Sequence, residues 1–155
     1  MHANAARVAA AAEAEGLTIE VQEHPDGTRT AADAAAAVGC EVGRIVKSLV
    51  FTVDGEPVIA LVAGDARLDE ALLAAAAGGS VGRADAEVVR AATGYPIGGV
   101  PPFGHPAPLP TFVDESLLAH ETVWAAAGTP RHVFEVAPAD LLRLSGGRAV
   151  PLAAG

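Results

Sequence analysis

The chain has 155 residues, of which 51% are hydrophobic, and it carries ten Lys and Arg against nineteen Asp and Glu, a net charge of −9. This length and apolar content fit a single domain over residues 1–155, and the lack of a transmembrane run or leader pattern predicts a cytoplasmic protein that does not enter a membrane. The acidic balance disfavours broad, sequence-blind binding to a polyanion, so any contact with nucleic acid has to be local or helped by a partner.

The first forty residues predict a helix, a strand and a second helix. Residues 4–15 are rich in alanine, begin at a cap residue, Asn4, and are followed by Gly16. Residues 17–22 alternate apolar and polar side chains, which is typical of a strand with one wet face. Thr30 and Asp33 resemble a capping box, which predicts a short helix ending near Gly39.

Residues 45–53 are rich in β-branched and aromatic side chains, and Asp54-Gly55 is a strong hairpin turn that leads into a return strand over 57–63. Both strands are apolar on both faces, which places them centrally in a sheet. Two helices are predicted over 68–77 and 85–92. Gly78 follows the first of these segments, and Gly94 lies two residues beyond the second.

The last third of the chain predicts a short strand at 111–113, a turn over 115–119 and a second hairpin that pairs 122–126 with 132–136. Pro138 then begins a helix through residue 144. Hairpins and scattered helices without strict βαβ alternation indicate an α+β fold. We expect a curled, mixed and mostly antiparallel sheet surrounded by helices.

Residues 93–105 contain four glycines and three prolines, which excludes an α-helix or a central strand. Gly98 and Gly99 can present uncovered backbone amides to a carbonyl or phosphate oxygen. The apolar residues of this segment indicate that it packs onto the core as a shaped loop. These residues are Tyr95, Ile97, Val100 and Phe103.

Lys47 interrupts an apolar row in the predicted strand 45–53, because period two places it on the face of Leu49 and Phe51. One interpretation is a lysine that extends its ammonium to water with its stem on the core. The other is an ammonium at the mouth of an apolar pocket, where it can bind an anion or polarise a carbonyl.

The segment Lys47-Ser48-Leu49-Val50-Phe51, followed by a Gly-Gly-Val-Pro-Pro loop at 98–102, closely resembles the YbaK/prolyl-tRNA synthetase-associated editing domain family, the aminoacyl-tRNA deacylases. The resemblance covers roughly residues 17–144. Its specificity lies in the pairing of a strand lysine with the G-x-x-x-P loop.

The resemblance implies a mixed sheet around a pocket for the 3′ aminoacyl-adenosine of a mischarged tRNA, with ester hydrolysis that needs neither metal, cofactor nor covalent intermediate. It implies a trans-acting deacylase for a small amino acid such as Ala, Cys, Ser or Thr, carried by tRNA-Pro or a related tRNA. A synthetase is a candidate partner, and the chain is expected to be a monomer or weak homodimer. The implied catalytic residues are Lys47, Gly98 and Gly99, and the implied substrate-binding residues are Ser48, Val100, Pro101, Pro102, Asp114 and His132.

Several of these residues have a structural explanation as well. Asp114 can cap the following turn, Ser48 lies on the opposite strand face from Lys47, and His132 can be a satisfied histidine of its hairpin. The single cysteine, Cys40, excludes an intramolecular disulfide, and no zinc-ligand spacing or nucleophile elbow is present. A non-catalytic module that binds an aminoacyl-adenosine or a synthetase, or a hydrolase of small free esters, remains as an alternative.

Overall fold

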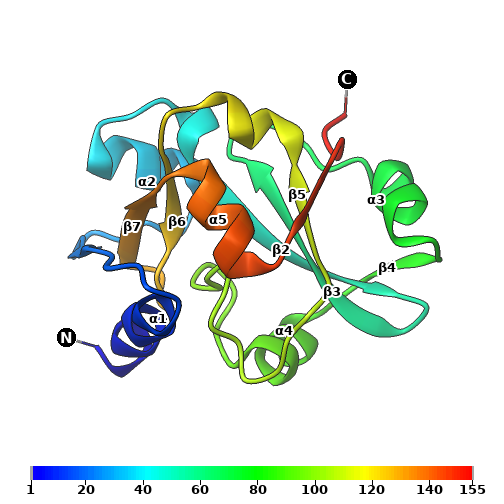
Figure 1. Ribbon diagram of the computed structural model, residues 1–155, viewed down its shortest axis with the longest axis horizontal. Coiled ribbons are helices and arrows are strands. Elements are labelled where there is room, and N and C mark those ends of the chain that lie inside the picture. The colour runs from blue at the N-terminus through cyan, green and yellow to red at the C-terminus, as the bar shows by residue number, and fades with distance from the viewer. Residues whose placement is uncertain (1, 155) are drawn as a thin grey trace.

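The computed structural model describes residues 2–154, which form two β-sheets and five α-helices (Figure 1). The larger sheet has the strand order β4-β2-β3-β5-β8. In it, β2 is antiparallel to β3 and β4, whereas β5 is parallel to β3 and β8. The strands are β2 (Val46–Val53), β3 (Glu56–Ala63), β4 (Val81–Arg83), β5 (Thr111–Asp114) and β8 (Arg148–Val150).

The smaller sheet has the order β1-β7-β6 and is antiparallel throughout. Its strands are β1 (Val21–Glu23), β6 (Val123–Ala126) and β7 (His132–Val136). A parallel bridge between Ile45 and Trp124 joins the start of β2 to β6. The predicted α+β class with mixed, mostly antiparallel pairing is therefore confirmed, although the strands form two sheets where one was expected.

The helices begin and end largely where capping chemistry predicts. The hydroxyl of Thr30 accepts a hydrogen bond from the amide of Asp33 at 3.0 Å, as a capping box requires. Asn4 was predicted to cap the first helix, but the cap is His2, whose ring Nδ1 accepts a hydrogen bond of 3.0 Å from the amide of Asn4. The helices are α1 (Ala3–Ala14), α2 (Ala31–Val38), α3 (Glu70–Ala77), α4 (Ala86–Thr93) and α5 (Pro138–Ser145), with 3-10 turns η1 (Val42–Arg44) and η2 (Glu115–Ala119). None of the helices in residues 2–154 is long and apolar enough to cross a membrane.

The strand predictions differ from the structure in extent. The hairpin turn is confirmed, since Asp54 and Gly55 both have positive φ, 51° and 85°. The alternating segment 17–22 contributes only Val21 and Gln22 to β1, because its partner β7 pairs with Val21–Glu23 alone. The three-residue strands β4 and β8 were not predicted, because such short segments carry no periodicity.

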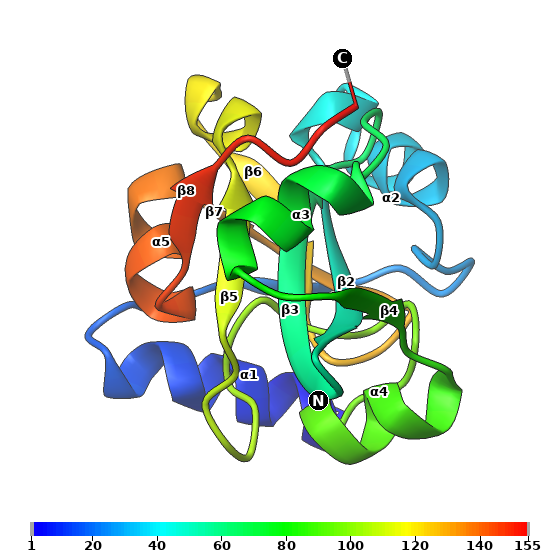
Figure 2. The same cartoon turned by 90° about the vertical axis from the view of Figure 1, so that its right-hand side faces the viewer.

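The central strand β3 is buried on both faces, as its apolar sequence predicts. Ile59, Leu61 and Ala63 enter the core between the two sheets, to which α1 and α5 also contribute. The alternate residues of β3 enter a second core under α3, which covers the opposite face of the larger sheet (Figure 2). These residues are Val58, Ala60 and Val62.

Candidate active site

Part of strand β2 has a free edge. On the side away from β3, β2 pairs with β4 only at Phe51–Val53, and Ile45, which precedes β2, bridges to Trp124. Between these two contacts, residues 47–50 have no strand partner on that side within the described part of the chain. Their edge lines a cleft instead.

The cleft consists of two adjoining hollows of about 490 Å³ and 420 Å³. The larger, which we call the arginine hollow, extends to Arg67 and Arg83 on the side of α3 and β4. The smaller, the alanine hollow, extends to Ala31 and Ala34 of α2 and to Ala126 of β6. The residues that line both are Lys47, Ser48, Leu49, Ile97, Gly98 and Val100.

Lys47 is half-buried where the hollows meet. Its ammonium donates a hydrogen bond of 2.6 Å to the backbone carbonyl of Ala66, in the segment that connects β3 to α3. Leu49 and Phe51 of the same strand face pack against the core under α3. The ammonium is thus held in place by one contact and retains donors for a ligand.

The loop 93–105 is anchored to the core, as expected. Tyr95, Val100 and Phe103 are buried, whereas Ile97, predicted to pack inward, is 50% exposed at the mouth of the cleft. Hydrogen bonds close the loop on itself, since the His105 ring Nε2 donates to the carbonyl of Pro101 at 2.8 Å. The loop is therefore an anchored wall of the cleft that presents the apolar side chain of Ile97 outward.

Gly98 and Gly99 play different parts in this wall. The amide of Gly99 donates to the carbonyl of Pro96 at 3.0 Å, which closes a tight turn with Gly98 at its third position, at φ 86°. The predicted presentation of the Gly99 amide is therefore wrong, because that hydrogen is already bonded. The amide of Gly98 has no hydrogen-bond partner within residues 2–154, and Gly98 lines both hollows.

Ser48 contributes an unusual group to the same place. Its hydroxyl oxygen is buried and has no hydrogen-bond partner in the described residues. A buried hydroxyl without a partner is destabilising, and such groups mark sites where a ligand or water completes the bonding. Val100 lies in the lining as predicted, whereas Pro101 and Pro102 are buried and line neither hollow.

The structure places Asp114 away from the cleft. Its side chain is 2% exposed and accepts hydrogen bonds from the amide of Leu152, at 2.8 Å, and from the hydroxyl of Ser116. Asp114 precedes η2 without capping it through its side chain. This carboxylate ties the C-terminal segment to the larger sheet, so its predicted place in the substrate site is not supported.

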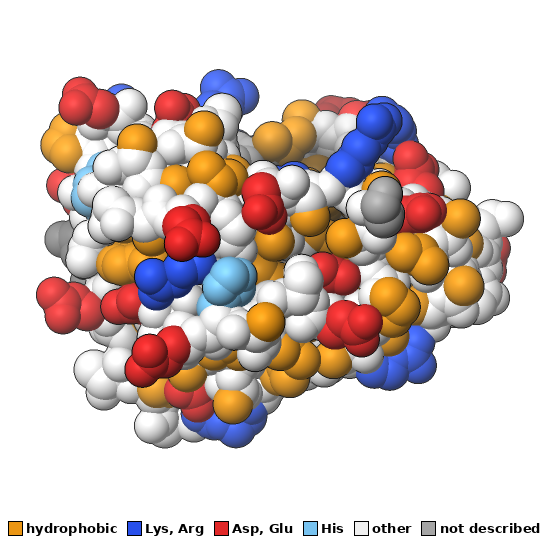
Figure 3. All heavy atoms as spheres, turned by 90° about the horizontal axis from the view of Figure 1, so that it is seen from above, with side chains coloured by type: hydrophobic (Ala, Val, Ile, Leu, Met, Phe, Trp, Pro, Cys, Tyr) orange, Lys and Arg blue, Asp and Glu red, His pale blue; other side chains and the backbone are white. Residues whose placement is uncertain are grey.

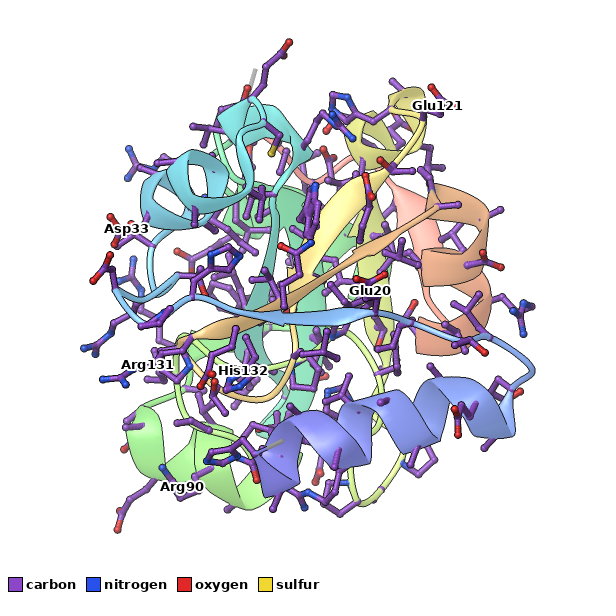
Figure 4. All side chains as sticks on the ribbon, turned by 90° about the vertical axis from the view of Figure 1, so that its left-hand side faces the viewer. Glu20, Asp33, Arg90, Glu121, Arg131 and His132 are labelled. Carbon is purple, nitrogen blue, oxygen red and sulfur yellow. The ribbon has the colours of Figure 1, made fainter. Side chains whose placement is uncertain are left out.

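His132 also lies elsewhere, on the side of β7 that faces α1 (Figure 4). Its ring bonds to the hydroxyl of Thr129, and its Nε2 is 3.6 Å from the Glu23 carboxylate. Because successive strand residues face opposite sides, the neighbouring Val133 enters the alanine hollow instead. The predicted role of His132 in substrate binding is therefore not supported by its position.

The sequence gives no sign that four of its ten basic residues line the cleft, together with only one acidic residue, Glu70. Figure 3 shows a recess at the upper edge of the view, with hydrophobic side chains inside it and basic side chains on either side. The four basic residues of the cleft come from separate segments of the sequence, so only the tertiary structure shows that they lie together. The four basic residues that line the cleft are Arg29, Lys47, Arg67 and Arg83.

Residues 2–154 contain no group of three or more His, Cys, Asp or Glu side chains placed to hold a metal ion.

A strand lysine that meets a Gly-Pro loop across a cleft is the arrangement that the resemblance implied. The sequence model of the aminoacyl-tRNA editing domain matches residues 25–144. The chain belongs to this family. It superposes with a TM-score of 0.95 on the crystal structure of "a putative trans-editing enzyme for prolyl tRNA synthetase", at 47% identity and over 100% of this chain and 99% of the other.

Sequence relatives agree with this assignment. The chain is 34% identical over 122 residues to the "Putative Cys-tRNA(Pro)/Cys-tRNA(Cys) deacylase EbsC" of Enterococcus faecalis, which covers 77% of this chain and 74% of that protein. It is 34% identical over 127 residues to the uncharacterized protein YwhH of Bacillus subtilis, over 81% of each chain. A proline–tRNA ligase of Maridesulfovibrio salexigens is 41% identical over 101 residues, which are 64% of this chain and only 17% of the ligase.

The packing of Gly99 yields a stability prediction. A β-carbon at Gly99 would lie 2.7 Å from the Cα of Thr129, so Gly99→Ala should destabilise the fold by about 2–3 kcal/mol in urea unfolding. Gly98→Ala is the matched comparison, because the closest neighbour of its β-carbon is the flexible side chain of Arg29, at 3.0 Å, and the nearest backbone atom is 3.8 Å away. Strain from its positive φ should cost about 1–2 kcal/mol. If Gly99→Ala keeps the wild-type stability but loses deacylase activity, the expected catalytic role of Gly99 would be supported instead.

The buried position of His132 predicts a pH dependence of stability. Burial lowers the pKa of His132 from its usual 6.5, while the carboxylate of Glu23 opposes the shift. The unfolded chain then binds the proton more tightly, so this contribution to stability is complete above about pH 6.5 and is lost as the pH falls through the folded-state pKa. Between about pH 7 and pH 5, His132→Asn should therefore lose less unfolding free energy than the wild type. Equal losses in parallel urea titrations would contradict the shift.

Proposed function

We propose that this chain is a trans-editing aminoacyl-tRNA deacylase that hydrolyses the ester between a small amino acid, such as Ala, Cys, Ser or Thr, and tRNA-Pro or a related tRNA. The observation that carries the proposal is the meeting of the Lys47 ammonium and the unpaired amide of Gly98 in one cleft, beside the free edge of β2. Membership of the editing domain family and the names of the relatives support it.

The proposed chemistry needs little more than these groups. An aminoacyl ester is already activated, so positioning water and stabilising the charge on the carbonyl oxygen can supply the acceleration. Water adds to the carbonyl carbon, the bond to the ribose oxygen breaks, and the free amino acid and the tRNA leave. The amide of Gly98 would donate to the developing oxyanion and the Lys47 ammonium would hold the substrate beside it, with no step through a metal or an enzyme nucleophile.

The alanine hollow suits the amino acid part of the substrate. Besides Arg29 and Lys47 it is lined mainly by apolar side chains, many of them small. Ala31, Ala34 and Ala126 are among them, beside the larger Trp124 and Val133. A pocket of this kind discriminates by volume, and one methylene is worth about 1–3 kcal/mol. The proposed selectivity for small amino acids would therefore depend on the space that these alanines leave.

The first test of the proposal is Lys47→Ala. The variant should remain folded, since the ammonium makes a single hydrogen bond, while single-turnover deacylation of mischarged tRNA falls by at least ~10²-fold. Lys47→Arg should not restore the rate, because the planar guanidinium needs more room than an ammonium. Thermal unfolding measured in parallel controls for the fold.

Two outcomes of that experiment would count against the site or the function. A folded Lys47→Ala protein with the wild-type rate would show that the lysine is only a strand residue. A wild-type protein that turns over no ester in a panel of tRNAs charged with Ala, Cys, Ser or Thr would favour the non-catalytic binding module.

The volume of the alanine hollow provides a second test. Ala126→Val adds two methyl groups to its wall and suits a strand, so kcat/KM should fall about tenfold more for the bulkier of two accepted amino acids than for the smaller. Ala149→Val, on the exposed strand β8, is the control for the same change of side chain outside the cleft. If both variants keep the wild-type preference between tRNA-Pro charged with either amino acid, the amino acid binds elsewhere.

A further inference from the structure

The arginine hollow is lined by two arginines that take no part in the proposed ester hydrolysis. Besides Lys47 it is lined by Arg67 and Arg83, opposed by one carboxylate, that of Glu70. The molecule as a whole has a net charge of −9. A group of cations in one hollow of an acidic protein attracts an anion locally, because a cleft focuses the electric field of the charges that line it.

Neither arginine is committed to the fold. Arg67 is exposed, and its guanidinium makes no hydrogen bond or ion pair within residues 2–154. Arg83 has a side chain that is 84% exposed, and its guanidinium nitrogen lies 3.5 Å from a carboxylate oxygen of Glu70. Exposed pairs at such a distance contribute little, so a phosphate can compete for Arg83 at small cost.

The wall between the two arginines is apolar. Phe51 and Leu68 are half-buried there and also pack against the core under α3. Phe51 is the register partner of Arg83 across the β2–β4 ladder, so the aromatic ring and the guanidinium come from adjacent backbone positions. An aromatic or apolar surface beside an arginine is how proteins hold a single nucleotide, with the base on the surface and the phosphate on the guanidinium.

We propose that the arginine hollow is a nucleotide subsite in which Arg67 and Arg83 bind the 5′-phosphate of the terminal nucleotide of the tRNA. The inference rests on the proposed deacylase function. The ester then lies at Lys47 and Gly98, where the hollows meet, and the amino acid enters the alanine hollow. The charges decide which end of the substrate enters which hollow. Besides the shared Lys47, the arginine hollow has two cations for the phosphate, whereas the alanine hollow has only Arg29.

The test compares two small substrates that differ only in the phosphate. One is the 2′(3′)-O-alanyl ester of adenosine, and the other is the same ester of adenosine 5′-monophosphate. The wild type should show a KM about tenfold lower for the phosphorylated ester, the scale of one charge-assisted contact. Arg67→Ala and Arg83→Ala should each raise that KM several-fold, toward the KM of the unphosphorylated ester.

Two control variants separate this subsite from charge in general. Arg90→Ala removes an equal charge from α4, outside the cleft, and should leave the KM for both esters unchanged (Figure 4). Arg29→Ala removes the cation that lines the alanine hollow but not the arginine hollow. If Arg29→Ala, rather than Arg67→Ala or Arg83→Ala, abolishes the advantage of the phosphate, the substrate lies in the opposite direction and the proposal is wrong.

Failure of this inference can be told apart from failure of the function. Hydrolysis of both esters with equal KM would leave the deacylase intact and remove the phosphate subsite. If neither ester nor any mischarged tRNA is hydrolysed, the proposed deacylase function is wrong. The existence of the phosphate subsite is then tested by measuring ligand binding. In that case calorimetry should show tighter binding of adenosine 5′-monophosphate than of adenosine, and equal binding would overturn the subsite.

Discussion

The burial of strand β3 on both faces is the constraint on which the architecture depends. Its alternate residues enter two separate cores, one between the sheets and one under α3. A strand with no polar face has to be covered on both sides, and it brings its hairpin partner β2 into the middle of the structure. Since β4 meets only the far end of β2, the lysine-bearing half of β2 is left beside an open space.

The loop 93–105 turns that space into a shaped cleft. Its buried residues anchor it in the core, and Gly99 lets its backbone approach the backbone of Thr129 at the hairpin of the smaller sheet. The wall of the cleft is thus fastened to both sheets. Gly98 can then hold its amide in a fixed direction, and a donor that needs no reorganisation is what stabilises developing charge best.

The sequence could predict those features that depend on local chemistry. Capping by Thr30, the turn at Asp54-Gly55 and the central position of the first hairpin all follow from residue types and their spacing. The resemblance to the editing domains supplied the pairing of the lysine with the loop.

Other features depend on contacts that no local pattern encodes. The Gly99 amide bonds within its own turn, and the carboxylate of Asp114 bonds to the distant Leu152, although both positions suggest a site. His132 does not line the alanine hollow, whereas its neighbour Val133 does, and which of two successive strand residues faces a pocket depends on tertiary packing. The arginines of the cleft come from segments that only the tertiary fold brings together.

The free edge of β2 has a consequence for the solution behaviour of the protein. Unpaired strand edges are templates on which a second chain can add a strand, and they promote aggregation. Here the opening spans only residues 47–50, flanked by β4 and by the bridge to β6, and the Gly-Pro loop stands across it. The segment that shapes the pocket therefore also keeps this edge from recruiting a neighbouring molecule.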